Sequence, residues 1–251
     1  MSFTEEEKKI NLEVLNNFIG YGNPNASIYF IGIEEHSPDK QKTIDYELEK
    51  KRLGIYKQAF KEKKPYYLTN ADFISLNETY KYNKTYSGIT KIFNTISPSN
   101  MITPQNIGDL NIDLFIANLY PLARATTKDS YNCFIKEFAF DNNFNEWSKK
   151  YWTPRKEILK DFFSKYLLQN TTSQKYIFCL GTSNGNWETF EIFIKELLND
   201  ASLKFECKHA NKNYYGLIKK DNLIFYCLYH PASRQFYKIN FVNIDGFKII
   251  L

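Results

Sequence analysis

The stretch Ile28-Tyr-Phe-Ile-Gly-Ile-Glu-Glu-His36 joins a short apolar run to a glycine, two carboxylates and an imidazole. The turn signal Asn23-Pro-Asn25 precedes it, and its β-branched and aromatic residues predict an inner strand. Open α/β sheets bind their ligands at the carboxyl ends of such strands. We therefore expect Glu34, Glu35 and His36 to lie in a ligand site. For any single strand, a solvated loop is the simpler interpretation.

Three later apolar runs end in polar residues in the same way. They cover residues 114–118, 176–180 and 223–228, and they lead into Asn118, Thr182-Ser183 and His230. Helical segments separate the four runs, which predicts βαβ units. The predicted fold class is α/β, a three-layer α/β/α sandwich with a central, mainly four-stranded parallel sheet. With 251 residues and 43% hydrophobic content, we expect one domain spanning residues 1–251.

Helices and one hairpin are predicted between these strands. Thr4 and Glu7 match a capping box, followed by an apolar face of Ile10, Val14, Leu15 and Phe18. Further helices are expected over residues 44–63, 89–96, 153–166 and 187–198, with Pro154 in the first turn of the third. A hairpin is expected around residues 211–213.

Composition limits the classes of function. The formal charge of +5 permits a polyanionic partner without requiring one. The cysteines, Cys133, Cys179, Cys207 and Cys227, form no C-x-x-C pair, and the three histidines lack metal-ligand spacing, so we expect reduced thiols, no metal and no cofactor. There is no apolar leader and no run of eighteen apolar residues, which predicts a cytoplasmic protein outside the membrane.

Taken in order, the four strand ends resemble the motifs of the uracil-DNA glycosylase superfamily. Gly32-Ile33-Glu34-Glu35-His36 resembles that family's Gly-x-Asp-Pro or Gly-x-Asn-Pro loop, and Asn118 resembles the Asn that reads the base edge. Leu180-Gly181-Thr182 is similar to its Leu-Gly loop, and His230-Pro231-Ala232-Ser233 to its His-Pro-Ser motif. The resemblance covers roughly residues 23–236. Glu35 replaces the expected Pro and Ala232 the expected Ser, which leaves the substrate open.

The resemblance implies a monofunctional DNA glycosylase that needs no metal. Such an enzyme hydrolyses the N-glycosidic bond of uracil or another altered base flipped out of DNA, leaving an abasic site. Glu34, with Glu35 in reserve, would orient a water and stabilise the cationic sugar, while His230 would donate to the departing base. Base contacts are implied for Asn118, Gly32, Ile33 and His36, and DNA contacts for Ser233, Arg234, Gln235, Thr182 and Ser183.

Other interpretations of these residues stay open. A binding module with the same fold and a disabled site is the main alternative, whereas a small-ester hydrolase lacks its Gly-x-Ser-x-Gly elbow. Asn118 would otherwise cap the turn before Pro121, and Arg155 would pair with a surface acid, as would Arg124. The aromatic that stacks on the base is not assigned; its candidates are Tyr66, Tyr67, Phe73 and Tyr86.

Overall fold

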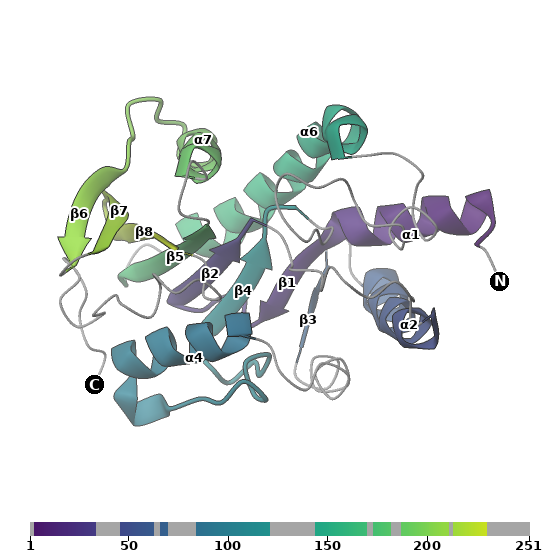
Figure 1. The fold of residues 1–251 in the computed structure, drawn as a ribbon, viewed down its shortest axis with the longest axis horizontal. Coiled ribbons are helices and arrows are strands. Elements are labelled where there is room, and N and C mark those ends of the chain that lie inside the picture. The colour runs from purple at the N-terminus through teal and green to yellow at the C-terminus, as the bar shows by residue number, and fades with distance from the viewer. Residues whose placement is uncertain are drawn as a thin grey trace. The chain divides into compact units, whose positions relative to one another are not determined.

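A computed structural model of the chain describes residues 3–33, 46–62, 66–69, 84–120, 144–169, 173–181, 187–210 and 213–229. The helices of this part are α1 (Glu5–Asn17), α2 (Tyr46–Glu62), α4 (Lys84–Ile96), α6 (Phe144–Phe163) and α7 (Trp187–Leu197). Its strands are β1 (Phe18–Gly22), β2 (Ile28–Gly32), β3 (Tyr66–Leu68), β4 (Leu114–Asn118), β5 (Lys175–Gly181), β6 (Glu206–Ala210), β7 (Asn213–Lys220) and β8 (Leu223–Tyr229). Figure 1 shows these elements along the chain.

The strands belong to one mixed sheet of order β3-β1-β4-β2-β5-β8-β7-β6. β2 pairs in parallel with β5, and β5 in parallel with β8, whereas β7 runs antiparallel to both β8 and β6. The α/β class and the β6–β7 hairpin are therefore confirmed. The sheet has eight strands where the apolar runs predicted mainly four, because the hairpin and the short β1 and β3 join it. The three-layer sandwich stays a prediction.

The chain divides into two compact units that interleave along the sequence. Unit 1 comprises Met1–Gly20, Ile33–Leu68 and Asn118–Phe162, and unit 2 comprises Tyr21–Gly32, Thr69–Ala117 and Phe163–Leu251. The expected single domain stays a prediction. The contacts that follow lie within one unit or the other.

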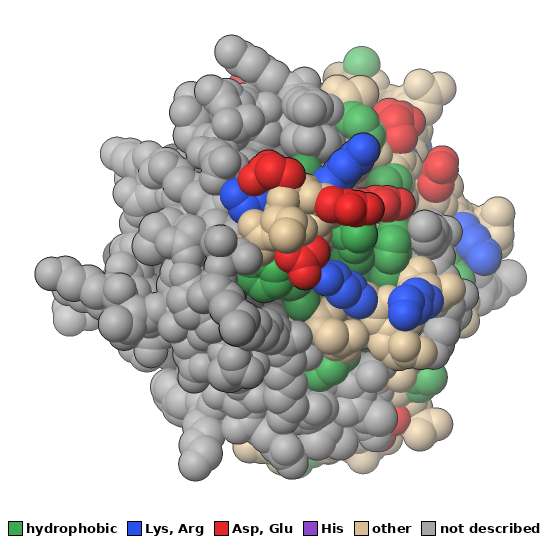
Figure 2. All heavy atoms as spheres, turned by 90° about the vertical axis from the view of Figure 1, so that its right-hand side faces the viewer, with side chains coloured by type: hydrophobic (Ala, Val, Ile, Leu, Met, Phe, Trp, Pro, Cys, Tyr) green, Lys and Arg blue, Asp and Glu red, His purple; other side chains and the backbone are tan. Residues whose placement is uncertain are grey.

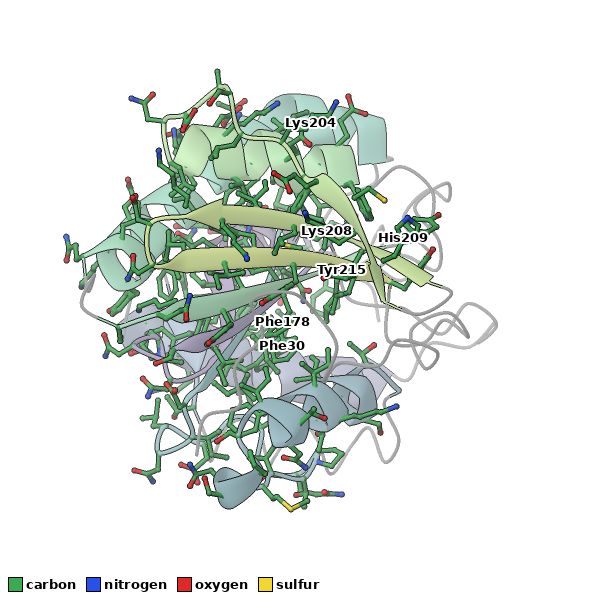
Figure 3. All side chains as sticks on the ribbon, turned by 90° about the vertical axis from the view of Figure 1, so that its left-hand side faces the viewer. Phe30, Phe178, Lys204, Lys208, His209 and Tyr215 are labelled. Atoms are coloured by element: carbon green, nitrogen blue, oxygen red, sulfur yellow. The ribbon has the colours of Figure 1, made fainter. Side chains whose placement is uncertain are left out.

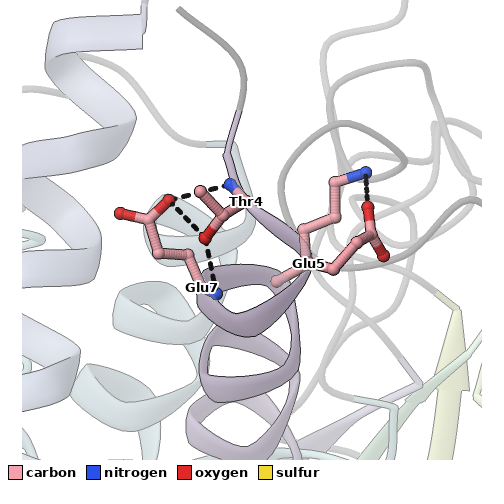
Figure 4. A network of polar contacts seen from close by, with 4 residues as sticks. Thr4, Glu5 and Glu7 are labelled. Atoms are coloured by element: carbon pink, nitrogen blue, oxygen red, sulfur yellow. Dashed lines mark hydrogen bonds and ion pairs between the residues drawn. The ribbon is translucent and has the colours of Figure 1, made fainter.

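In unit 1, helix α1 begins at the predicted capping box. The Thr4 hydroxyl accepts from the Glu7 backbone N–H at 3.2 Å, and the Thr4 backbone N–H donates to the Glu7 carboxylate at 2.8 Å (Figure 4). Both bonds satisfy donors that a helix start leaves open. Val14 and Leu15 are buried as expected, but Ile10 is 44% exposed, so the prediction for Ile10 was wrong.

In unit 2, aromatic rings stack across three parallel strands. Phe30, Phe178 and Tyr226 occupy matching register positions on β2, β5 and β8, with ring centroids 5.0 and 5.1 Å apart. Tyr215 on β7 continues the row at 6.3 Å from Tyr226. In Figures 1 and 3, α4 and α7 lie on opposite sides of these strands. The row thus forms part of the core of unit 2.

The amino end of β5 is closed by a buried lysine. Lys175 Nζ donates to the carbonyls of Ala26 at 3.3 Å and Tyr166 at 2.8 Å, and it lies 5.5 Å from the centre of the Tyr29 ring. Burial lowers the pKa of Lys175. Tyr166 belongs to a π-helical turn, Ser164–Leu168, that follows α6. The ammonium therefore satisfies a carbonyl at a helix end, where positive charge is favourable.

Two helices begin earlier than the sequence predicted. α6 starts at Phe144, so Pro154 lies inside the helix and not in its first turn. Pro154 is exposed, where solvent compensates the backbone hydrogen bond that proline cannot make. α4 starts at Lys84 and includes Ser87 and Gly88, which precede the helix predicted over residues 89–96. Gly88 is buried, so packing outweighs the roughly 1 kcal/mol that glycine costs in a helix.

Candidate functional site

The carboxyl ends of three parallel strands meet at one edge in unit 2. Gly32 of β2 is the register partner of Leu180, and Gly181 of β5 is the partner of Tyr229 of β8. Parallel neighbours lie about 4.8 Å apart, so these ends occupy a row of about 10 Å. Three of the four predicted motifs follow these strands in the chain.

The edge also contains a reversal of strand order. After β2 the chain forms β3 and β4 on one side of β2, whereas after β5 it forms β6, β7 and β8 on the far side of β5. The order therefore reverses between the neighbours β2 and β5. Open α/β sheets bind ligands outside the carboxyl ends of their strands at such a switch point. Gly32 and Gly181 are the residues that end the two strands there.

Most of the predicted site residues lie outside the described part of the chain. These are Glu34, Glu35, His36, Thr182, Ser183, His230, Ser233, Arg234 and Gln235. Gly32, Ile33 and Asn118 are described. The nine residues outside the described part follow β2, β5 or β8 in the chain, and these strands end at this edge. Their assignments therefore stay predictions.

In unit 1, a buried arginine holds the backbone around Asn118, the last residue of β4. Arg155 Nη2 donates to the Asn118 carbonyl at 2.9 Å, and its Nε donates to the Leu119 carbonyl at 3.2 Å. Its Nη1 donates to the carbonyls of Asn16, at 2.8 Å, and Phe18. One guanidinium thus ties the segment after β4 to the junction of α1 and β1.

Arg155 is 1% exposed, and every acceptor recorded for it in the described chain is a backbone carbonyl. The prediction that it pairs with a surface acid was therefore wrong. Burial lowers the pKa of Arg155 to about 9, an effect that nearby Tyr66 opposes, so the group stays charged at neutral pH. Four carbonyl dipoles supply the negative potential that a carboxylate would otherwise provide.

The residues after Asn118 are fixed by further contacts in unit 1. The Tyr120 backbone N–H donates to the Ile33 carbonyl at 2.7 Å, and the Tyr120 ring lies 4.8 Å from the Trp152 ring. The Asn118 side chain is partly buried, and the described residues provide it with no hydrogen-bond partner. A held backbone with an amide still able to donate and accept suits recognition of a planar polar ligand.

The described stacking candidates differ in burial. Tyr66 is 0% exposed, and its ring packs against Phe18, Tyr56 and Phe60 in unit 1. It is a core residue, so the prediction that it is available to a base was wrong. Tyr67 and Tyr86 are partly buried, and Phe73 lies outside the described residues.

The sequence contains one signal for the burial of Arg155 that the strand-end motifs do not reveal. Trp152, Arg155, Leu159 and Phe162 recur at helical spacing, which places the arginine on the apolar stripe of α6. Leu159 and Phe162 are buried with it. A cation within such a stripe is rarely buried without partners, and here the partners are carbonyls distant in sequence.

Surface charge, possible metal ligands and helix hydrophobicity in the described residues bear on which partners the protein could bind. Figure 2 shows acidic and basic side chains interspersed on the described part of the face that it presents, without a continuous basic patch there. No group of three or more His, Cys, Asp or Glu in the described ranges has the arrangement of a metal site. None of the described helices is both long and apolar enough to cross a bilayer.

No known protein family, curated protein or solved structure gives a significant match to this chain.

Proposed function

We propose that the protein is a metal-independent, monofunctional DNA glycosylase that acts in the cytoplasm. It hydrolyses the N-glycosidic bond of uracil or another altered base flipped out of DNA. The observation that carries the proposal is the strand-order reversal between β2 and β5, beside which the parallel strands β2, β5 and β8 end. The proposed fold is a three-layer α/β/α sandwich, which extends the mixed sheet described above.

In this mechanism, two charges develop and each has a proposed partner. Glu34 follows the end of β2 by two residues, within about 8 Å along the chain, and orients the attacking water. Its carboxylate also stabilises the cationic sugar. His230, the residue after β8, donates a hydrogen bond to the departing base. Glu35 is the reserve carboxylate.

The base is recognised by the amide of Asn118. What supports this role is the backbone around it, because Arg155 holds the Asn118 carbonyl at 2.9 Å while the side chain has no partner among the described residues. A pre-positioned amide loses little freedom when it binds a base edge. Ile33 and His36 complete the base contacts. Ser233, Arg234, Gln235, Thr182 and Ser183 contact the DNA strand.

Base release tests the proposal directly. Purified protein is incubated with a chelator and DNA containing uracil, hypoxanthine, thymine mismatches or bulky modified cytosines, and abasic sites are then cleaved with alkali. We expect a chelator-resistant product. Glu34→Gln and His230→Ala should each slow release at least about 100-fold while DNA affinity is retained. Unchanged release in both variants contradicts the assignment.

Matched variants separate chemistry from folding. Glu188→Gln removes an exposed carboxylate from the first turn of α7 and should leave release unchanged. Asn118→Ala truncates only the side chain, so the bonds from Arg155 to the backbone remain. We expect release to fall by about 10- to 100-fold, as when a buried polar contact is lost.

A binding module of the same fold is the second candidate. The sequence feature that favours it is the loss of two motif residues, with Glu35 in place of Pro and Ala232 in place of Ser. This candidate predicts DNA binding without product across the panel. Arg234→Ala would then weaken binding and reduce its salt dependence.

A further inference from the structure

The β6–β7 hairpin extends the candidate edge in register. His209 of β6 is the partner of Tyr214 of β7, and two positions further along β7 Gly216 is the partner of Cys227. Tyr214 therefore lies beside Tyr229, and their ring centroids are 5.6 Å apart. Since Tyr229 ends β8, His209 and Tyr214 continue the row of strand ends that carries the proposed site. Figure 3 shows His209 on the outer strand of this hairpin.

Tyr214 combines exposure with a fixed ring. It is 39% exposed, and among the described residues no other aromatic side chain is classed as exposed. Its ring lies 6.0 Å from Trp187 in an edge-on contact, and its hydroxyl is hydrogen-bonded to that of Tyr229. A ring held on two sides loses little entropy when a flat ligand stacks on its free surface.

The strand order sets the distance between this ring and the end of β2, which Glu34 follows. From β2 to β7 there are three strand intervals, or roughly 14 Å. A stacked DNA strand rises about 3.4 Å per nucleotide, so this span corresponds to about four nucleotides and to fewer in an extended strand. At this distance from the end of β2, Tyr214 is within reach of a neighbouring base on the same strand.

The basic side chains labelled near the hairpin do not gather around the Tyr214 ring. Lys208 is the register partner of Tyr215, on the other face of the hairpin from Tyr214, and it forms an ion pair with Glu206 at 2.9 Å. Figure 3 shows Lys204 before the start of β6, toward α7 and away from His209. Phosphate attraction alone would therefore be weak here. An aromatic surface, in contrast, stacks with any unpaired base.

We propose that Tyr214, with His209 beside it, is a stacking site for an unpaired base of the DNA strand that carries the excised base. This inference rests on the proposed function for its ligand class. It names a contact outside the catalytic motifs, and it implies a preference for single-stranded over fully paired DNA around the target.

Fluorescence anisotropy tests the site on the full chain. The probes are labelled oligodeoxythymidine and the same strand paired with oligodeoxyadenosine, and base release is measured in parallel. We expect Tyr214→Ala to weaken single-strand binding by about 5- to 100-fold and Tyr214→Phe to change it less than about twofold. Duplex binding should be unaffected. Ile192→Ala removes an exposed apolar side chain of α7 and should change neither single-strand nor duplex binding.

Further variants keep the test decisive. Tyr214→Leu preserves apolar volume without a π face and should lose affinity as the alanine variant does, which covers a failure of Tyr214→Ala to fold. Wild-type affinity in Tyr214→Leu, or equal losses on both probes, overturns the stacking site. If that occurs while base release persists, only this inference fails. If the wild-type protein neither binds DNA nor releases a base, the proposed function fails as well.

Discussion

Tyr214 and Tyr215 are neighbours in the chain, yet their side chains belong to two aromatic groups with opposite surroundings. Tyr215 is 1% exposed and extends the buried row of Phe30, Phe178 and Tyr226. Tyr214 is 39% exposed and joins a second group with Trp187, Phe205 and Tyr229. We call these the buried row and the edge group. Both lie within unit 2.

The difference shows that two separate effects decide whether a strand side chain is buried. One is the alternation of side chains along the strand, and the other is the packing of further elements over each face. Alternation sends consecutive side chains to opposite faces of a strand, which accounts for the separation of Tyr214 from Tyr215. It does not decide which face is covered. Trp187, at the start of α7, covers only part of the edge group. The buried row therefore serves stability, whereas the edge group leaves one of its rings, Tyr214, exposed.

Truncation within the buried row should have the largest effect on folding. Phe178→Ala removes a ring stacked between Phe30 and Tyr226, so the free energy of unfolding should fall by about 3–5 kcal/mol. Urea unfolding followed by circular dichroism measures this change. Tyr214→Ala is the control and should cost less, about 1–2 kcal/mol, because its ring is partly exposed but contacts Trp187 and Tyr229. Equal losses in the two variants would contradict the comparison.

A smaller loss is expected where the edge group meets the hairpin. A Cβ added at Gly216 would lie 3.0 Å from ring atoms of Phe205, so Gly216→Ala must displace that ring. We expect a loss of about 1–3 kcal/mol in the free energy of unfolding. Gly54→Ala is the matched control, since nothing lies within 4 Å of its added Cβ in α2. That variant should gain about 0.5–1 kcal/mol.

The tyrosine pair of the edge group makes stability sensitive to alkaline pH. Burial, together with the hydrogen bond and charge of Tyr214, raises the pKa of Tyr229 to about 12 from an ordinary value of 10.0. Since the unfolded state ionises first, this contribution is complete below about pH 10 and is lost as pH rises toward 12. Tyr214→Phe should lower the pKa of Tyr229, measured by tyrosinate absorbance. An unchanged titration relative to wild type would argue against the hydrogen bond.

The smallest effect is expected at the other end of the hairpin. Lys220 forms an ion pair with Asp200 at 3.2 Å, and Lys220→Ala should cost no more than about 1 kcal/mol in the free energy of unfolding. It should not change DNA affinity, because Lys220 lies at the far end of β7 from Tyr214. The measurements are urea unfolding and anisotropy. A loss of affinity comparable to that of Tyr214→Ala would extend the DNA-binding surface beyond the edge group.

Much of the secondary structure was predictable from local patterns. The strand begun by Ile28 has the predicted start, the Thr4–Glu7 capping box forms, and the hairpin falls where turn residues separate two short strands. These signals depend on residues close in sequence, because caps, turns and side-chain periodicity are local effects. Helix starts were less accurate, since Pro154 and Gly88 are tolerated through their surroundings.

The candidate site was only partly predictable. Strand-end motifs indicated which edge to examine, and Asn118 does end β4. The role of Arg155 was not apparent, although its helical spacing was a clue. The sequence did not indicate that the Tyr214 ring is exposed, because side-chain alternation alone does not show which of Tyr214 and Tyr215 faces solvent.

The sequence alone determined the identity of the inner strands, the hairpin and the polar residues that follow each strand. Tertiary structure decided the strand order that reverses between β2 and β5, the partners of Arg155 and the exposure of Tyr214. The physical reason is separation along the chain. Arg155 meets Asn16 across 139 residues, and such contacts form only when distant segments have packed together.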